Sequence, residues 1–250
     1  MPIARKISVY LLPSLVEPED LAGKTAVVID VLRATTTIIH ALAAGASQVA
    51  VCQEIDEARQ MAADIPGSRL LGGERAGGKI AGFDLGNSPA EYTSQEVAGK
   101  TIVFTTTNGT RAMKRCQRAR RVLIGAFVNF SAICRELAAE EDLALVCAGT
   151  DGMVTREDTL FAGAIVDEMC RTNDCELNDQ AAIAADAWRF AVRDLTFQPL
   201  GQTLRATRGG RNLIEIGQEN DIEIAAQIDK FDLVPELDLV MWQIRPTLAP

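Results

Sequence analysis

The sequence predicts an α/β protein of three layers, in which helices cover both faces of a largely parallel or mixed sheet. Apolar runs of strand length alternate with helical patterns over the first two-thirds of the chain, which is typical of βαβ units with right-handed crossovers. Aliphatic residues are abundant and aromatic residues make up only 5% of the chain, as expected of parallel strands packed under helices. A length of 250 residues is enough to bury a full hydrophobic core.

The expected strands are short runs rich in Val, Ile, Leu and Ala, at residues 7–11, 26–30, 48–51, 70–71, 101–105, 122–124 and 143–147. The helices expected between them carry apolar residues at helical spacing, at residues 35–44, 55–63, 109–118, 131–139 and 158–170. After Arg171 the pattern changes to two amphipathic helices and a last apolar strand, at residues 179–192, 211–227 and 237–244. The second of these helices is interrupted by Gly217.

The βα pattern restarts at Ala126. This restart predicts two α/β lobes, residues 1–125 and 126–250, that flank a cleft, and a single domain is the alternative.

The formal net charge of −9 argues against nucleic acid as a partner, because binding to a phosphate backbone needs clustered Lys and Arg. The one basic cluster, at residues 114–121, is interpreted as the end of a helix, where cations offset the helix dipole. In so acidic a chain, an anionic ligand must be met by a local positive site made of arginines, backbone N–H groups or a metal ion.

The six cysteines show neither a CxxC pair nor the spacing of zinc ligands. Most of them lie in apolar runs, which is typical of reduced, buried thiols in a cytosolic protein. The first residues lead directly into an alternating strand pattern without the apolar region of a signal peptide, and no apolar run is long enough to span a membrane. We therefore expect a cytoplasmic protein.

Ligands of open α/β sheets bind where strands end and helices begin, and four unusual segments stand at such points. The first, VVIDVLRATTT at residues 27–37, ends a strand at Asp30 and begins a helix after Arg33. Asp30 is a candidate Mg²⁺ ligand, and Arg33 with the free N–H groups of the helix start suits an anion. An ordinary strand end at Asp30 followed by a threonine N-cap, at Thr35 or Thr36, explains these residues equally well.

The second segment, GGERAGGKIAGFDLGNSP at residues 72–89, nearly matches a phosphate-binding P-loop. Ile80 stands where the Mg²⁺-binding Ser or Thr of a P-loop belongs, and no apolar helix follows, so a P-loop nucleotide site is rejected. Six glycines from Gly72 to Gly86 raise the entropic cost of ordering the segment, which favours a functional loop over a mere connection.

The third segment, VFTTTNGTR at residues 103–111, runs from a strand into Thr, Asn and Gly before a helix. Hydroxyl groups and free N–H groups at a helix start can form a cradle for an oxyanion. An ordinary capped helix would need only one of these residues.

The fourth segment, at residues 147–158, joins a strand end, a glycine turn and an acidic helix start. Glu157 is interpreted as a complement to the helix dipole. Asp151 and Asp158 are candidate metal ligands or bases.

Several mechanisms are excluded by the residues that the chain lacks. His40 is the only histidine and lies in a helical apolar pattern, so histidine-phosphatase and Ser-His-Asp chemistry are ruled out. No Cys is followed by Arg six positions later, and Asp30 has Leu32, not a second Asp, two positions on. Carboxylates, arginines, hydroxyls and glycine N–H groups remain, and they suit metal-assisted hydrolysis.

Together the four segments resemble the 2-phosphosulfolactate phosphatase family of coenzyme M biosynthesis. The matching stretches are VVIDVLRATTT, GGER with GFDLGNSP, TTTNGT, CAGTDG with ED, and more weakly GRNLIEIGQENDIEIAAQID at residues 210–229. They cover nearly the whole chain in the same order. The resemblance implies an α/β phosphatase that hydrolyses 2-phosphosulfolactate, or a closely related phosphorylated hydroxy acid, to 3-sulfolactate and phosphate with Mg²⁺ as cofactor.

The resemblance also implies the residues of the site. Catalytic roles are expected for Asp30, Glu74 and Asp158, with Asp30 and Glu74 as metal ligands and Asp158 as a candidate third. The residues expected to bind the substrate are Arg33, Thr35, Arg75, Asn87, Ser88, Thr106, Asn108 and Gly109. Within this set, Thr106, Asn108 and the Gly109 N–H are expected to form the oxyanion cradle.

Two other classes of function stay open on the sequence. A non-catalytic binding protein for small phosphate or sulfonate anions would explain the arginines and glycines, although carboxylates facing the same cleft would repel an anion unless a metal ion lay between. A phosphotransferase would need a nucleotide site, and the rejected P-loop is the sole candidate. The partner expected is a small anionic phosphate ester, with neither nucleic acid nor membrane, and a homodimer is kept open.

Overall fold

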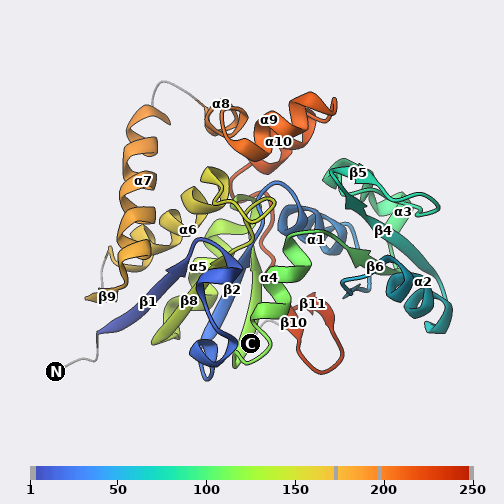
Figure 1. Ribbon diagram of the computed structural model, residues 1–250, viewed down its shortest axis with the longest axis horizontal. Coiled ribbons are helices and arrows are strands. Elements are labelled where there is room, and N and C mark those ends of the chain that lie inside the picture. The colour runs from blue at the N-terminus through green and yellow to red at the C-terminus, as the bar shows by residue number, and fades with distance from the viewer. Residues whose placement is uncertain (1–3, 172–173, 196–198, 248–250) are drawn as a thin grey trace.

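The computed structural model describes residues 4–171, 174–195 and 199–247 and shows helices on both faces of one large sheet (Figure 1). In this part of the chain the sheet has 11 strands in the order β5-β4-β6-β3-β11-β10-β7-β2-β8-β1-β9. The strands are β1 (Arg5–Tyr10), β2 (Thr25–Ile29), β3 (Gln48–Val51), β4 (Arg69–Arg75), β5 (Gly78–Lys79), β6 (Thr101–Thr105), β7 (Arg121–Gly125), β8 (Asp142–Cys147), β9 (Cys175–Leu177), β10 (Pro235–Asp238) and β11 (Gln243–Pro246). The predicted three-layer α/β/α class is confirmed.

The sheet consists of two parallel blocks joined by an antiparallel hairpin. One block is β4-β6-β3 and the other is β7-β2-β8-β1-β9. Between them, β10 and β11 pair with each other and with one strand of each block, always antiparallel. The short β5 adds to the outer edge of the first block, antiparallel to β4.

The sequence predicted one last strand at residues 237–244. This prediction is wrong, because the chain turns back inside the segment. The Asp238 side chain accepts hydrogen bonds from the backbone N–H groups of Val240 (2.8 Å) and Met241 (3.0 Å). This side-chain turn replaces the continuing strand and creates the β10–β11 hairpin.

Strands from both sides of residue 125 alternate within the sheet. β2 pairs with β7 and β8, and β1 pairs with β8 and β9. A division into residues 1–125 and 126–250 would therefore pass between hydrogen-bonded strands. The two blocks of the sheet do not coincide with it.

The helices follow the strand ends as the alternating pattern predicts. They are α1 (Ala34–Ala43), α2 (Ile55–Asp64), α3 (Ser94–Val97), α4 (Gly109–Arg115), α5 (Phe130–Glu136), α6 (Arg156–Met169), α7 (Asp179–Leu195), α8 (Leu200–Arg205), α9 (Arg208–Glu215) and α10 (Asn220–Ala225). The expected helix at 211–227 is split, since Gly217 has a positive φ of 71° after the end of α9. We call residues 200–225, which form α8 to α10, the helical cap.

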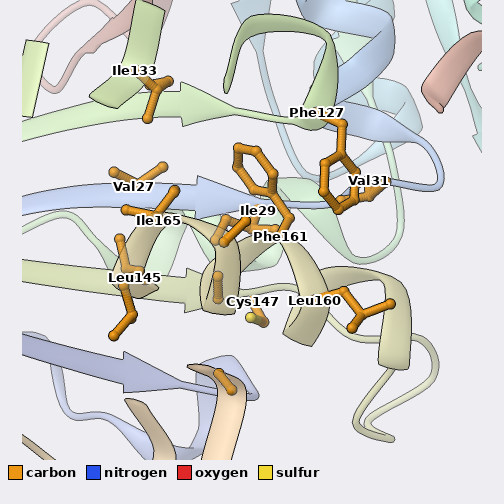
Figure 2. Close-up of a cluster of buried hydrophobic side chains, with 14 of the residues drawn as sticks. Val27, Ile29, Val31, Phe127, Ile133, Leu145, Cys147, Leu160, Phe161 and Ile165 are labelled. Atoms are coloured by element: carbon orange, nitrogen blue, oxygen red, sulfur yellow. The ribbon is translucent and has the colours of Figure 1, made fainter. Parts of the chain in front are cut away.

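Alternate side chains of the central strand β2 enter two separate cores. Val27 and Ile29 face one core with Phe127 and Phe161, whose rings meet edge to face at a centroid distance of 5.1 Å (Figure 2). Ala26 and Val28 face the other core. Helices α5, α6 and α7 cover the first face and α1 and α4 the second. Because β2 is buried on both faces, the first polar residue after it is held firmly at the end of the sheet.

None of the helices in the described parts of the chain is long and apolar enough to cross a membrane.

Candidate active site

A cavity of about 550 Å³ opens where β2, β4, β6 and β8 run into their loops. Its polar wall comes from the end of β4 and from the loops that follow the strands, with Asp30, Arg33, Glu74, Arg75, Asn87, Thr107, Asn108, Thr150 and Asp151. The helical cap completes the wall with residues of α9 and the residue after it, Gly209, Asn212, Leu213, Glu215 and Ile216. In Figure 1 the cap lies above the loop that joins β2 to α1. A second hollow, of about 580 Å³, lies between the start of α2 and β5. Neither Asp30 nor Glu74 lines it, so we place the chemistry in the first cavity.

Asp30 directly follows the buried strand β2 and is itself only 7% exposed. Its Oδ1 accepts a hydrogen bond from the Ala34 N–H at 3.2 Å, at the start of α1. The Thr35 hydroxyl closes the same turn by donating to the Asp30 carbonyl at 2.8 Å. Among the described residues no group donates to Oδ2, so one carboxylate oxygen is left for a ligand.

Burial raises the pKa of Asp30 to about 7, although the Ala34 N–H and Arg33 favour the ionised form. The neighbouring carboxylates Glu74 and Glu157 add to the rise. Negative groups this close together in a buried wall favour a bound cation, which would restore the ionised form of Asp30.

Glu74 lies at the end of β4 and both of its carboxylate oxygens accept backbone hydrogen bonds. Oε1 accepts from the Thr107 N–H at 2.7 Å, and Oε2 accepts from the Gly77 N–H at 2.9 Å. These two bonds fix the side chain between the β4–β5 turn and the β6–α4 loop. Each oxygen keeps a lone pair, because a carboxylate has about four acceptor sites.

Arg33 lies on the cavity wall, and its guanidinium is held by an ion pair with Asp221 of α10 at 2.8 Å. It also donates to the Gly77 carbonyl at 2.9 Å and to the Gln218 side chain. The other oxygen of Asp221 accepts a hydrogen bond from the Ser88 hydroxyl at 2.5 Å. Ser88, expected to touch the substrate, thus lies behind the wall in the structure.

Arg75 is a second guanidinium on the wall. It donates to the Glu74 carbonyl at 2.8 Å, to the Thr105 hydroxyl at 3.0 Å and to the Gln53 carbonyl. In the described parts of the chain no carboxylate lies within ion-pair distance of it, so its charge is available to an anion.

Two predicted amides also line the cavity. The Asn87 carboxamide oxygen is buried and has no hydrogen-bond partner among the described residues. Asn108 precedes α4, and its side-chain oxygen accepts from the Asp151 N–H at 3.4 Å. Buried polar atoms are nearly always paired in folded proteins, so the unpaired carboxamide oxygen of Asn87 is available to bind a ligand.

Four further predicted residues lie behind the wall with Ser88. Thr35 is bonded to the backbone of Asp30, and the Thr106 hydroxyl pairs with that of Thr110 at 3.2 Å. Gly109 and Asp158 are buried among protein atoms. Thr107, which the sequence did not single out, instead lines the cavity, and its hydroxyl has no partner among the described residues.

Asp158 joins the loops that follow β2 and β8. Its Oδ1 accepts from the Val31 N–H at 2.9 Å, while Oδ2 accepts from the Gly149 N–H and the Thr155 hydroxyl, both at 3.0 Å. Burial and the nearby Asp30 raise the pKa of Asp158, and the two backbone N–H groups oppose the rise. Among the described residues these three hydrogen bonds tie Asp158 to the backbone and side chain of neighbouring loops.

Glu157 was interpreted from sequence as a dipole complement, yet its side chain is only 1% exposed. Its Oε1 accepts from the Gly209 N–H at 3.0 Å, which anchors the start of α9. A Cβ on Gly209 would lie 2.1 Å from that oxygen, so a side chain at this position would displace the Glu157 carboxylate from its bond. Burial raises the pKa of Glu157, and its Oε2 has no partner in the described structure.

Gly109→Ala is expected to lower both stability and activity. A Cβ at this position would lie 2.6 Å from the Ala34 Cβ and 3.0 Å from Asp30 Oδ2, the free oxygen. The starts of α1 and α4 would have to separate, at a cost of about 1–3 kcal/mol. We expect kcat/KM for phosphate release to fall about 10-fold or more. Urea unfolding of the same samples measures the loss of stability.

Gly78→Ala is the matched control, because its Cβ would have only the Arg75 carbonyl at 3.8 Å nearby. Wild-type behaviour of both variants would show that the two helix starts are not packed as described.

The donor set on the wall suits Mg²⁺. This ion is bound in proteins by one or two carboxylates together with water and substrate phosphate, and Asp30 and Glu74 supply two. Among the described residues no group of three or more His, Cys, Asp or Glu side chains could hold a metal ion by itself. The wall therefore fits an ion completed by the ligand better than a closed metal site.

The chain is similar to known proteins over most of its length. A family model described as 2-phosphosulpholactate phosphatase matches residues 10–239. A protein of Symbiobacterium thermophilum named probable 2-phosphosulfolactate phosphatase is 44% identical over 221 residues, covering 87% of this chain and 92% of its own. Proteins of the same name from Caldanaerobacter subterraneus subsp. tengcongensis and Thermotoga maritima are 40% and 43% identical, covering 89% and 86% of this chain and 91% and 89% of their own.

Proposed function

Because this chain belongs to the 2-phosphosulfolactate phosphatase family, we propose that it hydrolyses 2-phosphosulfolactate to 3-sulfolactate and inorganic phosphate. The enzyme is then a phosphoric monoester hydrolase, with Mg²⁺ as its cofactor. In the reaction the oxygen of water becomes bonded to phosphorus as the ester P–O bond breaks. The water proton ends on the released alcohol, which becomes the hydroxyl of sulfolactate.

One observation carries this proposal: Asp30 presents a free carboxylate oxygen to a cavity that also holds Glu74 and two guanidinium groups. An anion-binding protein would need the arginines, but carboxylates in the same wall would repel its ligand. Both signs of charge are useful when a divalent cation and a phosphate ester bind together.

In this proposal the acidic residues of the wall bind the cation, and the basic and neutral residues bind the substrate. Asp30 and Glu74 would hold Mg²⁺, which when bound neutralises phosphate charge and acidifies a water molecule. Arg75, whose charge has no carboxylate partner in the described structure, would bind one of the anionic groups of the substrate. Asn87 and Thr107 offer neutral polar atoms to the remaining oxygens.

Phosphate release from 2-phosphosulfolactate is expected to depend on Mg²⁺. Adding EDTA should lower the rate about 100-fold or more, because the two carboxylates then face an anion without a cation between them. The measurement is phosphate release by the purified protein with Mg²⁺, with EDTA, and with EDTA followed by excess Mg²⁺.

A phospholactate without the sulfonate is the companion substrate. Turnover of it alone would assign a related phosphorylated hydroxy acid as the substrate. Tight binding of sulfolactate with no turnover of either ester would instead show a binding protein and overturn the proposal.

We also propose a cytoplasmic location, supported by six cysteines that are free thiols. A homodimer is a further proposal, supported by the large apolar side chains Ile183 and Phe190, which α7 exposes along one stripe. Light scattering of the purified protein tests the second of these.

A further inference from the structure

The ion pair between Arg33 and Asp221 is the most deeply buried one that the described structure contains. The two side chains are 4% and 2% exposed, and their atoms lie 2.8 Å apart. The residues are 188 positions apart in the chain, so the pair joins the β2–α1 loop to the helical cap. It also forms part of the cavity wall through Arg33.

The hydrogen bonds of Arg33 leave one edge of its guanidinium free. Of its five N–H groups, Nη1 uses two on Asp221 and Gln218, and Nη2 uses one on the Gly77 carbonyl. In the described chain the Nε–H and the second Nη2–H have no acceptor. The Nε and Nη2 atoms share one edge of the planar group, and their spacing matches two oxygens of a phosphate, carboxylate or sulfonate.

Both carboxylate oxygens of Asp221 are fixed by hydrogen bonds. One oxygen accepts from Arg33, and the other accepts from the Ser88 hydroxyl at 2.5 Å. Because both ends of the pair are fixed, the guanidinium plane cannot rotate without breaking a buried ion pair.

We propose that Asp221 is a positioning residue that aims the free edge of Arg33 at an oxyanion of the substrate. Asp221 does not itself touch the ligand. It occupies the far edge of the guanidinium and so selects the edge that faces the cavity. The proposal deepens the phosphatase function above and rests on it.

Asp221→Asn tests the proposal, because the variant keeps the shape of the side chain and loses its charge. We expect KM for 2-phosphosulfolactate and the inhibition constants for sulfolactate and inorganic phosphate to rise about 10–100-fold, with a smaller change in kcat. Arg33→Lys, which keeps the charge and loses the planar fork, should raise the same constants. Adding Asp221→Asn to Arg33→Lys should then change them little, because the two residues act as one unit.

Glu223→Gln is the matched control, two positions along in α10. It removes an exposed ion pair with Arg205 at 2.9 Å, within the cap and away from the cavity. This variant should bind phosphate and sulfolactate as the wild type does. If Asp221→Asn fails to fold, Ser88→Ala removes the second anchor of Asp221 and should raise the inhibition constants several-fold.

Wild-type inhibition constants in folded Asp221→Asn, or full additivity with Arg33→Lys, would overturn the proposal and leave the pair a structural link. Failure of the phosphatase function would look different, since the wild type would then release no phosphate. In that case calorimetry with sulfolactate and inorganic phosphate still compares the affinities of wild type and Asp221→Asn directly.

Discussion

Asp30→Asn is expected to lower kcat/KM about 10³-fold or more, and at the same time to make the metal-free protein more stable at pH 8 than the wild type. The activity falls because the free Oδ2 becomes an amide nitrogen, which cannot bind a cation. The fold is retained because the one bond that the Asp30 side chain makes to the described residues, from the Ala34 N–H to Oδ1 at 3.2 Å, can still form to an amide oxygen.

The gain in stability follows from the pKa of Asp30. Burial raises this pKa from an ordinary 3.8 to about 7, so the folded protein binds a proton that the unfolded chain has released between these values. Stability is therefore highest below pH 4 as far as this group is concerned, and it falls as the pH rises to about 7. The full cost is about 4 kcal/mol, and Asn, which does not ionise, avoids it.

Urea unfolding at pH 5 and pH 8, with EDTA or with Mg²⁺, measures both parts of this prediction. Mg²⁺ should stabilise the wild type at pH 8 and have little effect on Asp30→Asn. Asp56→Asn is the control, because that carboxylate is 94% exposed and belongs to an ordinary surface ion pair. An active Asp30→Asn variant, or one that Mg²⁺ stabilises as much as the wild type, would remove Asp30 from the metal site.

The strands could largely be predicted because most of them are apolar runs that end abruptly. Residues 101–105 were expected as a strand and β6 is Thr101–Thr105, and residues 26–30 correspond to β2 (Thr25–Ile29). The hairpin of β10 and β11 could not be predicted, since its turn lies inside an apolar run and depends on side-chain bonds of Asp238. Hydropathy carries no sign of such a turn.

The site could be predicted as a place, but less well as a set of side chains. Strand ends indicate where loops meet, and Asp30 and Glu74 do lie on one cavity. The choice between neighbours depends on internal bonds: Thr106 is paired with Thr110, whereas the hydroxyl of Thr107 has no partner in the described residues. The spacing of threonines in the sequence cannot distinguish these two roles.

Partners that are distant in the sequence were missed for another reason. Asp221 lies in an ordinary acidic stretch near the start of α10. Only its ion pair with Arg33, 188 positions away, distinguishes it from the other acidic residues there. Glu157 stands in the first turn of α6, where acids are common, and only the approach of Gly209 shows that it is buried.

Asp158→Asn is expected to have the opposite effect to Asp30→Asn: it should lower the free energy of unfolding by about 2–4 kcal/mol. The Asp158 side chain accepts two backbone N–H bonds, from Val31 at 2.9 Å and from Gly149 at 3.0 Å, one on each oxygen. An asparagine offers one oxygen and one NH₂ group, so one buried N–H must then face another donor. Burial raises the pKa of Asp158, but even a protonated carboxyl keeps two acceptor oxygens where the amide keeps one.

Urea unfolding in EDTA at pH 8 measures the loss, and a thermal scan should show a fall of about 2–4 °C for each kcal/mol. Asp30→Asn under the same conditions is the matched comparison, since that residue has one backbone bond where Asp158 has two. Phosphate release per folded molecule should fall far less in Asp158→Asn than in Asp30→Asn, because all the bonds of Asp158 go to loop atoms. A stable Asp158→Asn variant that releases no phosphate would give Asp158 the direct catalytic role that its place after β8 suggested, and would make the two aspartates a single working pair.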